Sequence, residues 1–217
     1  MRNRKILILL MILPLVITLV ALQYLPDSIP AHYGYDNTVT RWGSKYETLI
    51  FPAITVSFGL FMLFMAKVSS KDEKNGQNNE KVCILTGIMS LAVFNIMTLF
   101  FLYTAFNKVE DLSTAPADIN RLMFASIGML MIVIGNKMPK LKINSFIGLR
   151  TPWSMENEES WRRSQRFGGI VFMITGMIII IISILTKGTE CMLCCLAALI
   201  LSAIISVYGT YKISKNI

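Results

Sequence analysis

Six apolar runs, each close to the length of a membrane span, constrain this sequence more than any other feature. A hydrocarbon core about 30 Å thick needs about 20 apolar residues in a helix that rises about 1.5 Å per residue. The chain of 217 residues is 54% hydrophobic and only 16% charged, whereas a typical soluble domain is about 25% charged. The runs are Ile6–Leu25, Leu49–Ala66, Val82–Phe106, Leu122–Ile134, Gly168–Thr186 and Cys191–Tyr211. We therefore expect an all-α fold, a six-span transmembrane helix bundle.

The fourth run is the shortest and needs separate support. Its helix can begin earlier, near Ala117, because Pro116 suits a first helical turn and Asp118 suits the positive end of a helix. Arg121 then has to extend its side chain to the membrane interface.

The distribution of Lys and Arg supports the fourth span and predicts the orientation. With six spans, sixteen of these cations fall on one side of the membrane and five on the other. Cytoplasmic loops are enriched in Lys and Arg, so both termini are predicted to be cytoplasmic. The net charge of +8 is mostly this cytoplasmic collar, and its expected partner is anionic lipid. Nucleic acid is not expected as a direct partner, because no basic domain stands free of the membrane.

The first run also resembles a signal peptide, since cations precede it. Its length and the lack of a clear cleavage site favour an uncleaved span. We divide the chain into a two-span unit at residues 1–68 with an outer loop at 26–48, a pair of spans at 82–134, and a unit at 135–217 that contains a long cytoplasmic loop. Residues 71–81, KDEKNGQNNEK, read as a polar, mobile linker.

The outer loop has the pattern of a small hairpin. Ala31–Tyr35 and Thr38–Trp42 are expected to form short strands, and Asp36 and Asn37 tolerate the positive φ of a tight turn. Tyr and Trp side chains in this loop would lie near the lipid headgroups.

The cytoplasmic loop carries stronger local signals. Pro152 favours an extended conformation at Thr151, and Ser154 can then cap a helix. Three glutamates followed by three arginines match the dipole of a helix over Met155–Arg166. We expect this helix to lie at the membrane surface and to continue into the fifth span.

Three side chains of the same loop have predicted roles. Trp153 and Trp161 are expected to anchor the ends of the interfacial helix. Arg150 lies between apolar residues and needs an anionic partner or helix carbonyls.

Residues typical of catalysis or metal binding are sparse. His32 is the one histidine, and a lone loop histidine favours local hydrogen bonding over a metal. Ion and proton pathways usually require charged residues within the spans. The spans of this sequence hold none away from their ends. Cys194, Ala198, Ser202 and Ser206 recur every four residues, which favours a packing stripe of small side chains. We expect no cofactor, no metal and no enzymatic activity.

Two stretches resemble known families. GNKMPKLKINSFIGLRTPWSMENEESWRRSQRFGG, residues 135–169, resembles the signature of the SdpI family of bacterial immunity proteins. LPDSIPAHYGYDNTVTRWGSK, residues 25–45, resembles an uncharacterised outer-loop domain often found before it, which more usually has glycine where this chain has Asn37. The matching motif residues are Ile147, Gly148, Arg150, Thr151, Pro152, Trp153 and Trp161 in the first stretch, and Pro30, His32, Tyr33, Trp42 and Gly43 in the second.

The resemblance implies a multi-pass protein of the bacterial cell membrane. Characterised relatives protect the cell against a secreted, membrane-active toxic peptide, and such a relative can also hold a winged-helix repressor at the membrane. The expected partners are therefore the toxic peptide, anionic lipid and a repressor. A small transporter or channel is the alternative reading, and a membrane enzyme is a third.

Overall fold

Six long helices form the molecule, as the apolar runs predicted. The computed structural model describes residues 2–70, 76–144 and 147–217. Over this part of the chain, six helices are long and apolar enough to cross a membrane. They are α1 (Arg2–Ala21), α2 (Ile50–Ser69), α3 (Gly76–Asn107), α4 (Ile119–Lys137), α5 (Glu158–Leu185) and α6 (Gly188–Lys215). The all-α, six-span fold is therefore confirmed.

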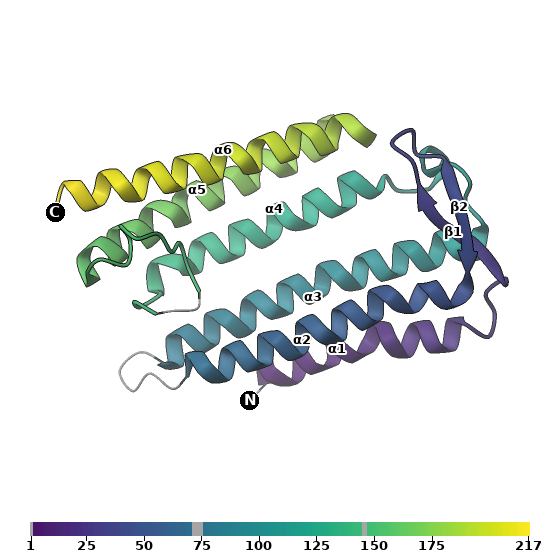
Figure 1. Ribbon diagram of the computed structural model, residues 1–217, viewed down its shortest axis with the longest axis horizontal. Helices are drawn as coiled ribbons and strands as arrows, with labels where there is room; N and C mark the ends of the chain where they lie inside the picture. Colours follow the sequence, from purple (N-terminus) through teal and green to yellow (C-terminus); the bar gives the residue numbers. More distant parts are fainter. Residues whose placement is uncertain (1, 71–75, 145–146) are drawn as a thin grey trace.

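The helices fall into two groups that run roughly parallel to one long axis. Figure 1 shows α1, α2 and α3 together along one side of the molecule and α4, α5 and α6 along the other. The two groups face each other through α3 and α4. Both chain termini lie at one end, here called the terminal end, and the small sheet lies at the other, here called the sheet end. Apolar side chains fill each group: one cluster joins α1, α2 and α3, and another joins α4, α5 and α6.

Short elements connect the helices. They are the strands β1 (Ser28–Tyr33) and β2 (Val39–Ser44) and the 3₁₀ turns η1 (Lys45–Leu49), η2 (Leu112–Thr114) and η3 (Met138–Lys140). The linker prediction for residues 71–81 was wrong for its second part, because α3 already begins at Gly76. Residues 71–75 lie outside the described part of the chain.

The start of α4 follows the sequence prediction, and Arg121 in its first turn contacts the end of α5. Asp118 caps the helix by accepting the backbone N–H of Arg121 at 3.1 Å. The Arg121 guanidinium donates to the carbonyls of Ser183 and Ile184, both at 2.6 Å. These carbonyls belong to the last turn of α5, where backbone acceptors lack helical partners and the helix end carries negative partial charge.

Helices α4 and α5 approach most closely at two pairs of glycines. A Cβ atom built on Gly128 would lie 2.7 Å from the carbonyl oxygen of Gly176, and one on Gly176 would lie 2.5 Å from that of Gly128. Gly135 and Gly169 form the same reciprocal pair, at 2.6 and 2.5 Å. In each helix the two glycines are seven residues apart. They therefore lie on one face, two turns from each other. Small residues let membrane helices pack backbone against backbone.

The packing face of α6 differs by one residue from the predicted stripe. Cys194 is exposed, whereas Cys195 is fully buried. The predicted stripe is therefore wrong at its first position and right further along, since Ser202 and Ser206 are buried. The buried face is Cys191, Cys195, Ser202, Ser206 and Thr210.

Candidate functional site

Two connecting segments carry the motif residues, one at each end of the bundle. The hairpin, residues 28–44, lies across the sheet end, and the α4–α5 segment, residues 141–157, lies at the terminal end. Each of them contacts both helix groups.

The hairpin forms as predicted, with strands shifted by up to three residues. β1 and β2 pair antiparallel, from Ser28 opposite Ser44 to Tyr33 opposite Val39, with irregular register on both sides of His32. The turn uses the residues expected for it: Asn37 has φ of 66°. The Asp36 carboxylate accepts the backbone N–H of Thr38 at 3.2 Å and its hydroxyl at 2.9 Å.

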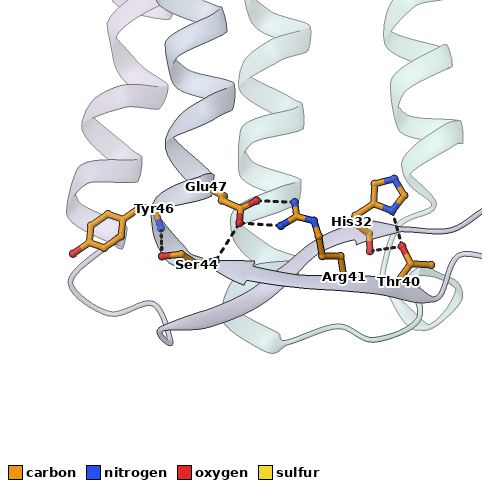
Figure 2. Close-up of polar contacts among 6 residues, drawn as sticks. All are labelled: His32, Thr40, Arg41, Ser44, Tyr46 and Glu47. Carbon is orange, nitrogen blue, oxygen red and sulfur yellow. Dashed lines mark hydrogen bonds and ion pairs between the residues drawn. The ribbon is translucent and has the colours of Figure 1, made fainter.

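An ion pair fixes the base of the hairpin to the start of the second span. Arg41 donates two hydrogen bonds to the Glu47 carboxylate, at 3.0 and 2.8 Å, and the same carboxylate accepts the Ser44 backbone N–H at 3.2 Å, as Figure 2 shows. Ser44 in turn accepts the N–H of Tyr46, so a capping box begins the 3₁₀ turn η1. The Glu47 carboxylate beside Arg41 raises the pKa of that guanidinium further.

Gly43 is needed for this arrangement. A Cβ atom at this position would collide with the Glu47 carboxylate and would lie 2.7 Å from the Ala31 Cβ. Any larger residue would therefore displace the carboxylate from Arg41 and from the Ser44 N–H.

The remaining residues of the outer motif do not form one cluster. His32 pairs through Nδ1 with the Thr40 hydroxyl at 2.6 Å on the exposed face (Figure 2). Tyr33 donates its hydroxyl to the carbonyl of Val109 at 2.8 Å. Pro30 is buried, and Trp42 is 41% exposed. Within the described residues, no group of three metal-ligating side chains occurs.

The hairpin tip reaches the second helix group. Val39 N–H donates to the carbonyl of Glu110 at 2.9 Å, and Leu112 N–H donates to the carbonyl of Asn37 at 3.0 Å. The hydroxyl of Thr189, in the first turn of α6, donates to the carbonyl of Tyr35 at 3.1 Å. The tip therefore joins the α3–α4 loop to the start of α6, a long-range contact that the sequence did not predict.

Gln165 holds the α4–α5 segment to α5. Its fully buried side chain accepts the Leu149 N–H at 3.0 Å and donates to the Leu149 carbonyl at 2.8 Å. Gly148 has φ of +106°, a region that favours glycine, and a Cβ there would lie 2.6 Å from the Gln165 Oε1. The motif glycine thus allows the backbone to approach the glutamine.

Ser154 does not cap the helix, so this prediction was wrong. Its hydroxyl is buried; it accepts the Thr151 N–H at 2.8 Å and donates to the Leu149 carbonyl at 2.8 Å. Asn157 caps the helix instead, accepting the N–H of Ser160 at 2.8 Å. The helix therefore begins at Glu158, three residues later than predicted, and continues without a break as α5.

The two tryptophans have different environments. Trp161 is only 2% exposed and donates its indole N–H to the carbonyl of Leu141 at 2.9 Å, so it is a core residue and the prediction of an interfacial anchor was wrong. Trp153 is partly exposed and meets Tyr211 of α6 edge-on, with ring centroids 5.3 Å apart. An indole buried with its N–H satisfied fixes a segment firmly.

The α4–α5 segment also contacts both helix groups. The Thr151 hydroxyl donates to that of Thr210 on α6 at 2.9 Å. Ile147 packs against the apolar cluster of α1, α2 and α3. The Lys142 N–H donates to the Asn79 side chain of α3 at 3.3 Å.

Arg150 and Pro152 remain at the surface of this segment. Both are exposed, and Arg150 makes no hydrogen bond or ion pair with the described part of the chain. The predicted partner of Arg150 is thus not a carboxylate or a carbonyl of the described protein. Gln165 orders the loop around Arg150. The sequence gives no signal for this role, because Gln165 is there only a glutamine near the start of the fifth span.

Comparisons with known proteins give results for both ends of the chain. The model of the SdpI/YfhL protein family matches residues 140–209, which include the α4–α5 segment. A domain of unknown function, DUF1648, matches residues 9–56, which include the hairpin. Over its full length, the chain is 24% identical to Immunity protein SdpI of Bacillus subtilis (strain 168), covering 98% of that protein. No solved structure matches the chain. The resemblance found in the sequence is therefore confirmed: an SdpI/YfhL family segment follows a DUF1648 segment in one multi-pass membrane chain.

Proposed function

We propose that this chain is a membrane immunity protein that protects its cell against a secreted, membrane-active toxic peptide. The observation that supports this most directly is the full-length similarity to Immunity protein SdpI. The structure is consistent with a role in recognition, because described residues of both motif segments are hydrogen-bonded to neighbouring elements and leave other side chains exposed.

In this proposal the hairpin recognises the peptide, and the α4–α5 segment transmits the signal to the cytoplasmic side. At the sheet end, the hairpin presents Trp42, His32 and Arg41 on its exposed surface. At the terminal end, buried contacts of Gln165 and Trp161 hold Arg150 outward. Because both segments bridge the two helix groups, a shift between the groups at one end would alter the other.

The orientation follows from the cation distribution. The sheet end faces outward, where the peptide arrives, and the terminal end faces the cytoplasm with both termini. The cations of the terminal end contact anionic lipid, and the surface around Arg150 is the contact for a winged-helix repressor in a signalling member of this kind.

Mixed culture tests the immunity function. A strain in which the gene is deleted is grown together with its parent, which secretes the peptide, and the survivors of each are counted. We expect the deletion strain to be lost and a plasmid copy of the gene to restore it. Equal survival of deletion strain and parent would contradict the proposal.

Orientation is tested by cysteine labelling in a background without the native cysteines. A cysteine at Asn78, near the start of α3, should be inaccessible from outside intact cells, whereas one at Tyr35, at the hairpin tip, should be labelled. The opposite pattern would reverse the assignment of the two ends.

A further inference from the structure

A pocket of about 330 Å³ opens at the sheet end, where the hairpin tip meets the second helix group. Asn37 of the hairpin, Ser113 of the α3–α4 loop, Arg121 of α4 and Lys187 before α6 contribute its polar wall; Leu112 and Ile119 contribute apolar surface. The pocket is therefore built from three stretches, distant in sequence, that meet only in the folded chain. Apart from Asn37, none of its residues belongs to the two stretches that carry the resemblance in the sequence.

Donors on the polar wall lack partners. Within the described residues, the side chains of Asn37 and Lys187 make no hydrogen bond or ion pair, whereas the Ser113 hydroxyl bonds to the Asp111 carboxylate. Arg121 uses Nε and Nη2 on the α5 carbonyls, which leaves Nη1 available. Three available donor groups thus converge on one cavity, two of them cationic.

The start of α6 adds positive potential to the same place. Lys187 is the N-cap residue and provides no side-chain cap. Lys187 therefore lies beside the positive end of a helix of 28 residues, and Glu190 in the first turn offsets part of this charge. Asp118, the carboxylate of the wall, accepts the Gly188 N–H at 2.6 Å and the Arg121 N–H at 3.1 Å, so its two oxygens are already engaged.

The chemistry of the wall selects a class of ligand. Cationic and neutral donors favour a carboxylate, and charge-assisted hydrogen bonds are the stronger kind. The apolar wall of Leu112 and Ile119 favours a ligand that carries an apolar side chain next to the charge. A carboxyl-terminal residue of an apolar peptide has both features, and capture of such a terminus by backbone and side-chain donors is a recurrent recognition mode.

We propose that this pocket binds the carboxyl-terminal residue of an apolar peptide, with its carboxylate at Lys187 and the start of α6 and its side chain against Leu112 and Ile119. If that peptide is the toxic peptide, which rests on the function proposed above, the pocket is where immunity begins. Arg121 links the pocket to the end of α5, the helix whose other end carries Gln165.

The test uses the full chain in phosphatidylcholine nanodiscs and the synthetic peptide acetyl-Leu-Leu-Val as free acid and as amide. Ligand-observed NMR measures the affinity of each. We expect the acid to bind at least about tenfold more tightly than the amide, the change that corresponds to about 1.4 kcal/mol. Lys187→Ala should lower the affinity for the acid by a similar factor, and Lys187→Arg should retain most of it.

Lys108→Ala is the matched control. It removes the same charge at the same end of the bundle from an exposed loop residue that does not line the pocket. Equal affinity of acid and amide, equal loss in Lys108→Ala and Lys187→Ala, or acetate binding as tightly as the peptide would each overturn the proposal. Displacement of the peptide in phosphatidylglycerol nanodiscs would assign the pocket to a lipid headgroup and overturn it as well.

The pocket and the proposed function can fail separately. Selective binding of the acid by the purified protein, without a survival defect of the deletion strain, would support the peptide site and contradict the immunity function. A clear survival defect without selective binding would support the immunity function and contradict the peptide site. A Lys187→Ala strain that loses binding but survives in mixed culture would show that the toxic peptide is not the ligand.

Discussion

Replacing Gly169 with alanine should destabilise the bundle, although alanine is the better helix former. The new Cβ would lie 2.5 Å from the carbonyl oxygen of Gly135, whereas ordinary contact begins near 3.4 Å. The obstacle is backbone on a packed helix, so α4 and α5 must move apart by roughly 1 Å. That movement also weakens the contact between Gly128 and Gly176 on the same faces.

The expected cost is the difference of two effects. Overpacking a close contact costs about 1–3 kcal/mol, and exchanging glycine for alanine within a helix returns about 1 kcal/mol. We therefore expect a net loss of up to about 2 kcal/mol for Gly169→Ala, and a larger loss for Gly169→Leu.

Gly87→Ala provides the matched control. It is the same exchange within a spanning helix, α3, but its new Cβ would meet the Leu7 Cδ1 at 2.9 Å and the Met62 Cβ at 3.2 Å. These are side-chain atoms, and the nearest is a flexible end that can rotate away. We expect Gly87→Ala to leave the stability unchanged or slightly raised.

The measurement is the midpoint of unfolding of each purified variant in one detergent, together with its abundance in the membrane. A lower midpoint for Gly169→Ala than for Gly87→Ala supports the argument. Equal midpoints would refute it, because they would mean that α4 and α5 separate without cost.

Three other predictions concern the two connecting segments. Gln165→Leu should lower the unfolding midpoint by the equivalent of about 1–3 kcal/mol, because it leaves the Leu149 N–H without its acceptor, while the Ser154 hydroxyl still donates to the Leu149 carbonyl; an unchanged midpoint would show that water replaces the amide. Arg150→Lys should reach the parent's abundance in the membrane but protect fewer cells in mixed culture, since lysine reproduces bidentate contacts poorly; full protection at equal abundance would reduce the segment to a positively charged collar. Lys45 lowers the pKa of Asp27 below the usual 3.8, so their ion pair should stabilise the hairpin fully above that pH and be lost as the pH falls through the lower folded value; NMR titration of the Asp27 carboxyl carbon checks it, and a midpoint at or above 3.8 would contradict it.

The sequence by itself determined the features that depend on neighbouring residues. Each span is apolar over its own length and satisfies its own backbone hydrogen bonds, so the number and approximate limits of the spans follow from local composition. The turn at Asp36 and Asn37 was predictable because few residues tolerate positive φ. The cap at Asp118 was predictable for a similar reason, since it needs one acceptor before a run of free N–H groups.

Only the tertiary structure decided which faces meet. The glycines of α4 and α5 are visible in the sequence at a spacing of seven, but nothing local says that they face one another. Trp161 was assigned to the interface because tryptophan favours that region, and the fold buries it on the Leu141 carbonyl instead.

The physical reason lies in the solvent of this protein. In a soluble helix, an apolar stripe marks the face that packs, because water surrounds the other side. In lipid both faces are apolar, so hydrophobicity carries no information about packing, and helices associate through close van der Waals contact and a few polar side chains. Gln165, Gly148 and the residues of the pocket at the sheet end acquire their roles only where such contacts bring distant segments together.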